Sequence, residues 1–595
     1  MRTSTQNVTK SPNNTRNTAI QPEKHNLPVP YETNATLNSL IDTAAAQYSD
    51  LPAIGMALEK PWSYNKFLNN ILLLAAKLQH AGVAKSDKVA ILAENSHCWG
   101  TAYMAIIRLG AVAVPILPDL PEADVHHILG EMKCKFLFIT QRQLEKIHEM
   151  KDKPDVVITL DDYNDKSGLV ATIPFKKYLN SAREEFALSL SSGEIKFSKV
   201  SDNDLASILY TSGTSGFSKA VMLSHANLYA NAQSSNQIIN LQPGSVFLSV
   251  LPVSHTYEFT TGFLMPLIKG CRIAYAGKTP TPAVLQKFCR KEKPHVMLIV
   301  PLIIEKIYKK RVIPAIEQNK ILSLACRIDF GRKIIHKRIG KKLLTFFGGR
   351  IECIGIGGAA LSPKVESFLR EASFPFLVGY GLTESAPLLA GGPQGDQSIA
   401  PSSTGKPVQN VEIQILDPDP TSGIGEILAK GPNIMQGYWN DPQATAETIN
   451  PEGWLHTGDL GFMDPQGNLH IRGRSKSVIV LANGENIYPE ALEHKLNSFP
   501  DVQESLVVEN NSILEAWLYP DYDRIDEDTQ GWDREQRHQY ILTRLEEIRT
   551  EVNNQSSSNS RITKIVERRE PFVKTATHKI KRYLYSAETM TPKKD

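Results

Sequence analysis

Residues 207–228 read SILYTSGTSGFSKAVMLSHANL, in which an apolar strand runs into seven residues that are Gly, Ser or Thr apart from Phe217. Small residues let backbone N–H groups and hydroxyls surround phosphate oxygens, and Lys219 adds a positive charge at the end of the run. The alternative is a solvated Ser/Gly linker. The pattern is not a Walker A loop, because Ser218 and Ala220 stand where that loop has its second glycine and its hydroxyl. We expect a nucleotide-binding loop of another class.

The segments before this loop alternate between helical periodicity and short apolar runs. Ser63 is a predicted helix N-cap, and the apolar helical face that follows it ends before Gly82. Residues 88–94 and 111–116 are predicted buried strands, and a helix is predicted at 99–109 between them. This alternation is typical of parallel sheets with helices on their faces. The predicted fold class is therefore α/β.

The strands of the second half are shorter and bounded by Gly and Pro, which favours antiparallel pairing. They are VEIQILD (411–417), GEILAKG (425–431) and NLHIRGR (468–474). A polar, acidic stretch at 521–535 leads into a predicted helix near 539–552, and NNQSSSNS (553–560) is a predicted loop.

Three parts are expected along the chain. Residues 1–30 are a predicted disordered tail, 31–473 a first domain and 474–595 a second domain. The predicted boundary near 473–476 separates a strand from a new α+β unit.

Composition excludes several classes of protein. The formal net charge of +3 over 595 residues is too small for a protein saturated with nucleic acid. Six scattered cysteines without a C-x-x-C pair argue against a zinc ribbon, a redox dithiol or a disulfide scaffold. No apolar run approaches the roughly 20 residues of a membrane span, and the first 27 residues lack a signal-peptide core. We expect a cytoplasmic protein.

Four further motifs accompany the loop. GIGGAA (355–360) fits the dinucleotide fingerprint, but no acidic residue follows about 20 positions later, which argues against NAD. GYGLTES (379–385) combines an aromatic ring, a hydroxyl and a carboxylate. GWLHTGDLG (453–461) is predicted to place an aspartate in a turn between two glycines, although such residues are often plain turn formers. GRSKSVIVLANGENIYP (473–489) combines a basic turn, a strand and a Gly turn.

With these motifs the chain resembles the adenylate-forming superfamily of acyl-CoA synthetases, luciferases and peptide-synthetase adenylation domains, from Thr36 to Tyr583. LPVSHTYE (251–258), the basic region before GGRIECIGIGGAALS, and TATHKIKRYL (575–584) are most similar to long-chain fatty acyl-CoA synthetases. The resemblance implies a large N-terminal domain of parallel sheets flanked by helices, with a small β-barrel-like subdomain, and a small mobile α+β C-terminal domain.

The resemblance also implies the chemistry and its cofactors, ATP, Mg²⁺ and coenzyme A. A carboxylate attacks the α-phosphate of ATP to give acyl-AMP and pyrophosphate, and a thiol then displaces AMP. Because two anions must meet, the site needs cations and oriented donors. The implied phosphate-binding residues are Thr211, Ser212, Gly213, Thr214, Ser215, Gly216 and Lys219. Mg²⁺ is assigned to Glu384 and Thr214, and the adenine and its flanking turn to Tyr380, Gly381, Gly357, Gly358 and Ala359.

The remaining roles concern the sugar, the reaction and the second domain. Thr383 is implied at the α-phosphate, Asp459 at the ribose hydroxyls, and Arg474 at the ribose or phosphate. Lys579 would bridge the carboxylate and the α-phosphate, Lys476 would be the hinge, and Gly484 would line the pantetheine tunnel. His255 has two interpretations, a residue beside the acyl and thiol substrates or a packed core histidine.

The chain departs from the family pattern at four positions without losing a required charge. Ser218 and Ala220 replace the usual Pro and Gly of the loop, and Val378 cannot bond adenine through its side chain. Ser477 stands where an acidic residue is frequent.

Residues 306–350 contain thirteen Lys or Arg and two acidic residues, a net charge of +11, interleaved with Leu and Ile. One interpretation is peripheral docking on an anionic membrane at its inner surface. The other is a solvated helix face that also attracts CoA phosphates.

We expect an ATP-dependent fatty acid–CoA ligase acting on a medium- to long-chain acid. One alternative is an acyl-AMP ligase or acyl-carrier-protein synthetase that loads a phosphopantetheine arm. Another is a non-catalytic lipid-binding homologue, against which the presence of both Glu384 and Lys579 argues.

Overall fold

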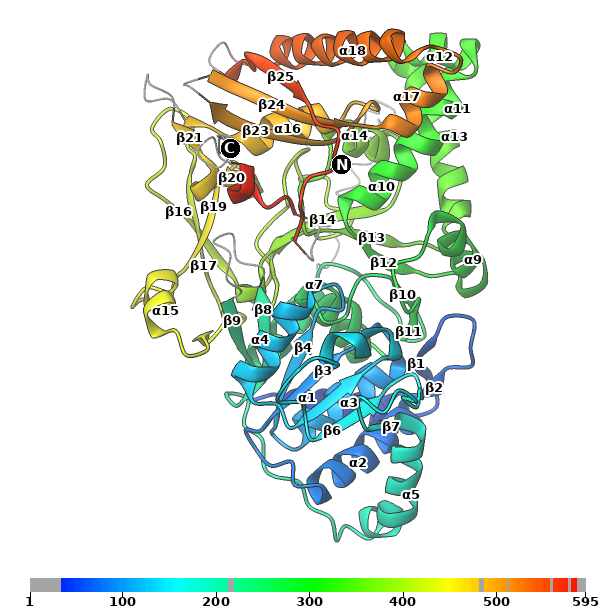
Figure 1. Cartoon of the computed structure of the whole chain (residues 1–595), viewed down its shortest axis with the longest axis vertical. Coiled ribbons are helices and arrows are strands. Elements are labelled where there is room, and N and C mark those ends of the chain that lie inside the picture. The colour runs from blue at the N-terminus through cyan, green and yellow to red at the C-terminus, as the bar shows by residue number, and fades with distance from the viewer. Residues whose placement is uncertain are drawn as a thin grey trace, which may run out of the picture. The chain divides into compact units, whose positions relative to one another are not determined.

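Two eight-stranded sheets organise the residues that the computed structural model describes, which are 34–211, 219–480, 486–510, 513–556, 560–575 and 579–585 (Figure 1). The first sheet has the order β15-β14-β13-β12-β10-β11-β1-β2 and is parallel except at its two edges. Its strands are β1 (Pro52–Met56), β2 (Trp62–Ser63), β10 (Val246–Ser249), β11 (Arg272–Tyr275), β12 (Val296–Ile299), β13 (Cys353–Ile356), β14 (Phe376–Gly381) and β15 (Leu388–Gly391).

The second sheet has the order β18-β9-β8-β4-β3-β5-β6-β7 and is parallel from β8 to β7. Strands β9 and β18 extend it in antiparallel fashion. Its strands are β3 (Lys88–Leu92), β4 (Val112–Ile116), β5 (Phe136–Ile139), β6 (Val156–Thr159), β7 (Thr172–Pro174), β8 (Leu205–Thr211), β9 (Lys219–Ser224) and β18 (Gly437–Tyr438).

The largest buried cluster joins one face of each of these sheets, with helices between them. Alternate residues of a strand point to opposite faces, so Ile91 belongs to this cluster while Leu92 packs on the other side of its sheet. The helices of the shared cluster are α1 (Leu37–Gln47), α2 (Tyr64–His80), α3 (His97–Arg108), α5 (Phe175–Ser191), α6 (His225–Ser235) and α8 (Met265–Ile268).

The outer faces of the sheets carry further helices. Those on the first sheet are α9 (Pro282–Glu292), α10 (Pro301–Ile307), α13 (Asp329–Phe346) and α14 (Pro363–Glu371). The second sheet is covered by α4 (Glu122–Met132) and the 3-10 helix η1 (Gln141–Ile147). Both sheets are thus buried on two sides, which explains why their strands read as continuous apolar runs.

A separate four-stranded antiparallel sheet follows in the order β16-β17-β19-β20. Its strands are β16 (Glu412–Leu416), β17 (Gly425–Lys430), β19 (Leu455–Met463) and β20 (Leu469–Arg474), with α15 (Pro442–Thr448) between the second and third. The antiparallel pairing expected from the short, Gly-bounded strands is confirmed.

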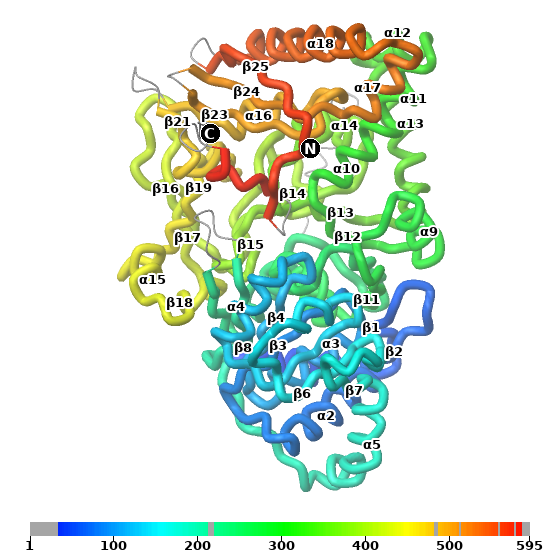
Figure 2. The backbone as a smooth tube through the Cα atoms, in the orientation of Figure 1, coloured from blue at the N-terminus to red at the C-terminus, as the bar shows by residue number. Residues whose placement is uncertain are grey.

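Residues beyond Arg474 form sheets and a core of their own (Figure 2). These elements are η5 (Ser475–Ser477), β21 (Ile479–Val480), β22 (Asn486–Ile487), α16 (Pro489–Asn497), β23 (Val502–Asn510), β24 (Ile513–Pro520), α17 (Tyr522–Asp528), α18 (Arg534–Asn554), β25 (Lys564–Glu567) and η7 (Arg582–Tyr585). In Figure 2 the orange strands β23 and β24 lie beside α16. The division at 473–476 remains a prediction.

Several local expectations can be compared with this fold. Ser63 caps α2 by accepting a hydrogen bond from the Lys66 N–H at 3.3 Å, and Gly82 follows the helix with a φ of 93°. The polar stretch 521–535 contains α17 and the start of α18, so the helix predicted near 539–552 begins earlier, at Arg534. Asp521 and Asp533 are the N-caps of these two helices.

Candidate active site

Strands β14, β19 and β20 bring Tyr380, Asp459 and Arg474 together. Asp459 lies opposite Arg474 in antiparallel register, and Arg474 Nε is 2.8 Å from Asp459 Oδ1. The Tyr380 hydroxyl donates to Asp459 Oδ2 at 2.7 Å. Burial raises the pKa of Asp459, while Arg474 and the Tyr380 hydrogen bond oppose that rise. Two donors on two different sheets therefore fix the direction of one buried carboxylate.

The position of Asp459 corrects a prediction, since this residue lies inside strand β19 and not in a turn. The strand accommodates the preceding Gly458 at a φ of 67°, a conformation that suits glycine. The Gly458 N–H donates to Glu426 Oε1 on the neighbouring strand at 3.1 Å. The glycine therefore adjusts the strand locally and does not end it.

Glu384 lies in the short helix η4 (Thr383–Ser385), directly after β14. Tyr438 of strand β18 donates a hydrogen bond to Glu384 Oε1 at 3.0 Å. The Lys219 ammonium lies 4.4 Å from the centroid of the same tyrosine ring. The second sheet thus supplies both a partner for Glu384 and a cation close to it.

The glycine-rich loop is described only at its two ends. Thr211 ends β8 and Lys219 begins β9, and the two residues face each other in antiparallel register. The Thr211 hydroxyl donates to the Lys219 carbonyl oxygen at 3.4 Å. Five predicted phosphate-binding residues lie outside the described part of the chain: Ser212, Gly213, Thr214, Ser215 and Gly216.

Lys579 reaches this site from the C-terminal region. Its side chain keeps contact with solvent, but the surrounding protein is dense enough to lower its pKa, and Arg474 lowers it further. Asp459 and Glu384 oppose that lowering, so both carboxylates lie within electrostatic range of the ammonium. The Lys579 backbone N–H donates to the Thr575 hydroxyl at 3.2 Å.

His255 lies close enough to Lys579 for the lysine charge to affect its pKa. It is the N-cap of α7 (Thr256–Glu258), and its Nδ1 accepts a hydrogen bond from the Tyr257 N–H at 3.2 Å. Burial, followed by the charge of Lys579, lowers its pKa to about 4. The imidazole is therefore neutral near pH 7, with Nδ1 held as an acceptor.

The glycines after strand β13 lie against an aromatic ring. A Cβ on Gly357 would stand 3.1 Å from Tyr257 Cζ, and Gly358 has a φ of 86°. Ala359 follows them and is exposed. At the end of β14, a Cβ on Gly381 would stand 2.0 Å from the Pro387 carbonyl oxygen, so no side chain fits there.

Two residues are predicted to take part in the domain movement. Lys476 lies exposed in η5, two residues after Arg474. Gly484 lies outside the described residues.

The described side chains fit a nucleoside triphosphate with Mg²⁺. Glu384 supplies a carboxylate, the kind of oxygen ligand that Mg²⁺ prefers together with phosphate. Three positive side chains can offset the negative charge of the phosphates: Lys219, Arg474 and Lys579. Glycine at 357 and 381 lets the Tyr257 ring and the Pro387 carbonyl group pack directly against the backbone.

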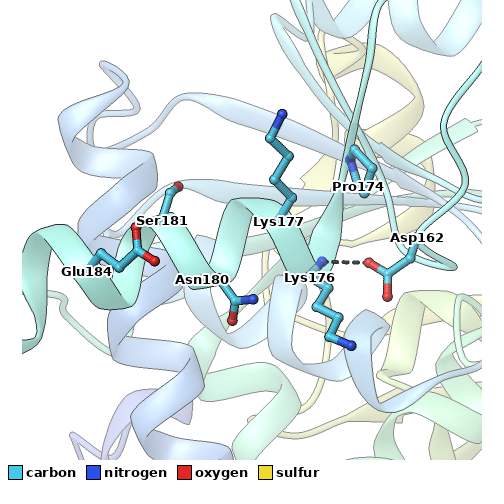
Figure 3. A pocket seen from close by; sticks show the side chains of 7 residues that line it. All are labelled: Asp162, Pro174, Lys176, Lys177, Asn180, Ser181 and Glu184. Atoms are coloured by element: carbon cyan, nitrogen blue, oxygen red, sulfur yellow. Dashed lines mark hydrogen bonds between the residues drawn. The ribbon is translucent and has the colours of Figure 1, made fainter.

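A surface depression elsewhere does not involve these residues (Figure 3). It is lined by Asp162, Pro174, Lys176, Lys177, Asn180, Ser181 and Glu184. The Asp162 carboxylate accepts a hydrogen bond from the Lys176 N–H at 2.6 Å, in the first turn of α5. Asp162 therefore satisfies an otherwise unpaired donor at a helix start.

Sequence reasoning missed Tyr438 and Tyr257. Tyr438 lies outside the quoted motifs, Tyr257 had no role assigned to it, and each contributes through a contact made only after folding. The only local signal was the position of Tyr257 within LPVSHTYE.

Among the described residues no helix is both long and apolar enough to cross a membrane.

Known proteins share sequence or fold with this chain. The model of the AMP-binding enzyme family matches residues 41–439. A long-chain-fatty-acid–CoA ligase of Drosophila melanogaster, heimdall, is 28% identical over 522 residues, covering 80% of this chain and 74% of that protein. The 4-coumarate–CoA ligase 2 of Oryza sativa subsp. japonica is 27% identical over 491 residues, covering 78% and 79%.

The solved structure of the anthranilate CoA ligase AuaEII with anthranoyl-AMP has the same fold. Its TM-score is 0.73 at 19% identity, and the match covers 93% of this chain and 96% of that one.

Proposed function

Because the chain belongs to the AMP-binding enzyme family, and is an adenylate-forming CoA ligase that uses ATP, Mg²⁺ and coenzyme A, we propose that its acid substrate is a medium- to long-chain fatty acid. The acid and ATP give acyl-AMP and pyrophosphate. Coenzyme A then displaces AMP through its thiol to give acyl-CoA. The relatives alone leave the acid open, since they include ligases named for a fatty acid and for 4-coumarate.

The observation that carries the fatty-acid proposal is an exposed apolar and basic surface, which we call the α12–α13 patch. Four large apolar side chains there are 64–78% exposed: Ile321, Leu324, Ile328 and Phe330. They lie on α12 (Lys320–Cys326) and at the start of α13. The exposed cations of α13 include Lys337, Arg338, Lys341 and Lys342.

Such a surface fits an anionic bilayer better than water. Apolar side chains enter the headgroup boundary while lysine and arginine meet anionic lipids. Arg332 is excluded from this role because it binds Glu371, with Nη2 3.0 Å from Oε1. We therefore place the protein at the cytoplasmic surface of a membrane, where a long-chain acid is dissolved.

The proposed residue roles follow the site. Lys579 offsets the repulsion between the carboxylate and the α-phosphate, and Asp459 with Arg474 holds the ribose. Tyr380 lies along adenine, while Thr383 contacts the α-phosphate. The loop from Thr211 to Lys219 holds the β- and γ-phosphates. When bound by Glu384 and Thr214, Mg²⁺ neutralises phosphate charge.

The second half-reaction requires a second arrangement. We assign residues 474–595 to a domain that rotates about Lys476, which withdraws Lys579 and brings Gly484 to the thiol tunnel. Such alternation is a hinge motion of the kind that completes a site in two stages.

The test is a panel of acids from acetate to a C18 fatty acid, with 4-coumarate included. Each methylene removed from water contributes about 0.8 kcal/mol, so kcat/KM should rise roughly fourfold per carbon until the acyl site is filled. Best turnover of 4-coumarate or of a short acid would refute the fatty-acid assignment. CoA is supplied as the only thiol, and acyl-AMP that accumulates without acyl-CoA would favour a carrier protein as acceptor.

A further inference from the structure

The side chain of Lys309 hydrogen-bonds to the turn that follows helix α16. Lys309 lies in the π-helical turn η3 (Tyr308–Val312), between α10 and α11 (Ile313–Glu317). Its Nζ donates to three backbone oxygens, those of Asn497 at 2.9 Å, Phe499 at 3.1 Å and Val502 at 3.1 Å. Asn497 ends α16 and Val502 begins β23.

The C-terminal end of α16 and the ammonium group of Lys309 are chemically complementary. The last carbonyl groups of a helix have no partner within it, and this end of the helix carries partial negative charge. An ammonium group has three N–H donors and no acceptor. Lys309 therefore presents three donors and a positive charge to three carbonyl oxygens, of which that of Asn497 lies at the end of α16.

Acidic groups on both sides of this contact favour the protonated form of Lys309. Burial lowers the pKa of Lys309, and Glu305, Asp521 and Asp501 oppose that lowering. Glu305 lies on α10, whereas Asp501 and Asp521 belong to the region after Arg474.

A second lysine holds the same turn. Lys364 of α14 places its ammonium 4.6 Å from the centroid of the Phe499 ring. Phe499 is buried in the core of the C-terminal region, so its position is fixed relative to α16. Two cations from separate helices thus contact residues 497–502.

We propose that Lys309 is a positioning residue that selects the adenylating conformation. Its contact with residues 497–502 holds the C-terminal region where Lys579 reaches Asp459 and Glu384. This inference rests on the two-conformation mechanism of the proposed function. Rotation about Lys476 breaks the contact, and the ammonium returns to water, where it is strongly hydrated. The contact is therefore reversible in each catalytic cycle.

The test is Lys309→Met, which keeps an unbranched side chain and removes the donors. Single-turnover formation of acyl-AMP from acid and ATP should fall roughly tenfold, because hydrogen bonds from a charged donor are lost. Formation of acyl-CoA from supplied acyl-AMP and CoA should stay at the wild-type rate or rise. The matched control is Lys310→Met, at the exposed neighbour in the same π-helical turn, which should leave both half-reactions unchanged.

Each other outcome overturns the proposal. Equal loss of both half-reactions would mean that Lys309 supports only the folded structure, and no loss of either would mean that the contact selects no conformation. The assay uses whichever acid the wild type activates best, so a wrong fatty-acid assignment appears in the wild-type panel and not in this comparison.

Discussion

The hydroxyl of Tyr438 donates a hydrogen bond to Oε1 of Glu384 at 3.0 Å, across 54 positions of sequence. The ring of Tyr438 also lies beneath the Lys219 ammonium, 4.4 Å from it. Two groups that we assign to the metal and to the phosphates therefore share one aromatic side chain. Removal of a partner that orients a metal-binding ligand typically lowers metal affinity by about 10–100-fold.

The first prediction follows from this relationship. Tyr438→Phe keeps the ring beneath Lys219 and removes only the hydroxyl. The Mg²⁺ concentration for half-maximal pyrophosphate release should rise roughly tenfold or more, because Glu384 loses its orienting partner. An unchanged Mg²⁺ dependence, measured by titration at saturating ATP, would show that Tyr438 does not orient a metal ligand.

Removal of the carboxylate itself should have a larger effect. Glu384→Ala should lower the rate of pyrophosphate release by at least about 100-fold, because charge stabilisation is a large catalytic contribution. Glu447→Ala is the control, since Glu447 is an exposed acid on α15. A near wild-type rate in Glu384→Ala would reject its assignment to Mg²⁺.

The α12–α13 patch gives a prediction on membrane binding. Replacing Lys337, Arg338, Lys341 and Lys342 by Gln should weaken binding to phosphatidylserine-containing liposomes by more than about tenfold at low salt, since each cation contributes ~1 kcal/mol. Phe330→Ser should weaken binding as well, at any salt concentration. The control is Leu188→Ser, at a lone apolar side chain that is 85% exposed on α5.

Two readouts separate membrane docking from a solvated helix face. Turnover of a soluble short-chain acid should change little in all of these variants. Equal liposome binding by the wild type and the four-residue variant would leave the solvated-face interpretation as the correct one.

Acid should destabilise the fold through buried histidines. His225 is fully buried, its Nδ1 accepts a hydrogen bond from the Leu37 N–H at 3.3 Å, and burial lowers its pKa to about 4. Asp204 opposes that lowering and Lys85 adds to it. Between pH 6.5 and 4 the unfolded chain binds a proton that the folded chain does not. The stabilising contribution is therefore complete above pH 6.5 and is lost as the pH falls toward 4.

The measurement is urea unfolding at pH 7 and pH 5. His225 should account for about 2 kcal/mol of the decrease in unfolding free energy between these values. His225→Asn retains an acceptor for Leu37 but does not titrate, so its decrease should be smaller by that amount. His80→Asn, at an exposed histidine, is the control, and an equal pH dependence in both variants would contradict the assignment.

Local features of the fold could be predicted from sequence because neighbouring residues determine them. The cap at Ser63 and the strand containing Ile91 follow from periodicity and capping chemistry. The two glycines around Asp459 predict a turn, whereas pairing with Arg474 keeps this residue in a strand. Tertiary pairing there overrides the local preference.

Contacts between distant segments could not be predicted in this way. Glu384 and Tyr438 meet only because strand β18 extends the second sheet, and no spacing in the sequence encodes that extension. Lys309 is one of thirteen cations in a basic segment, and its partners are backbone oxygens that carry no side-chain signature. The charged residues of the motifs could be predicted from the sequence. The residues that orient them could be identified only from the fold.

The two-step mechanism predicts opposite defects for Lys579 and Gly484. Lys579 lies among Asp459, Glu384 and Arg474, so it belongs to adenylation, where a cation must offset repulsion between the carboxylate and the α-phosphate. Lys579→Ala should block acyl-AMP formation and leave thioester formation from supplied acyl-AMP largely intact. Gly484 is assigned to the other conformation, and Gly484→Leu should fill the thiol tunnel, so acyl-AMP still forms but is transferred poorly to CoA. Both half-reactions are measured in both variants. Loss of the same half-reaction in each would reject domain alternation, and with it the assignment of these two residues.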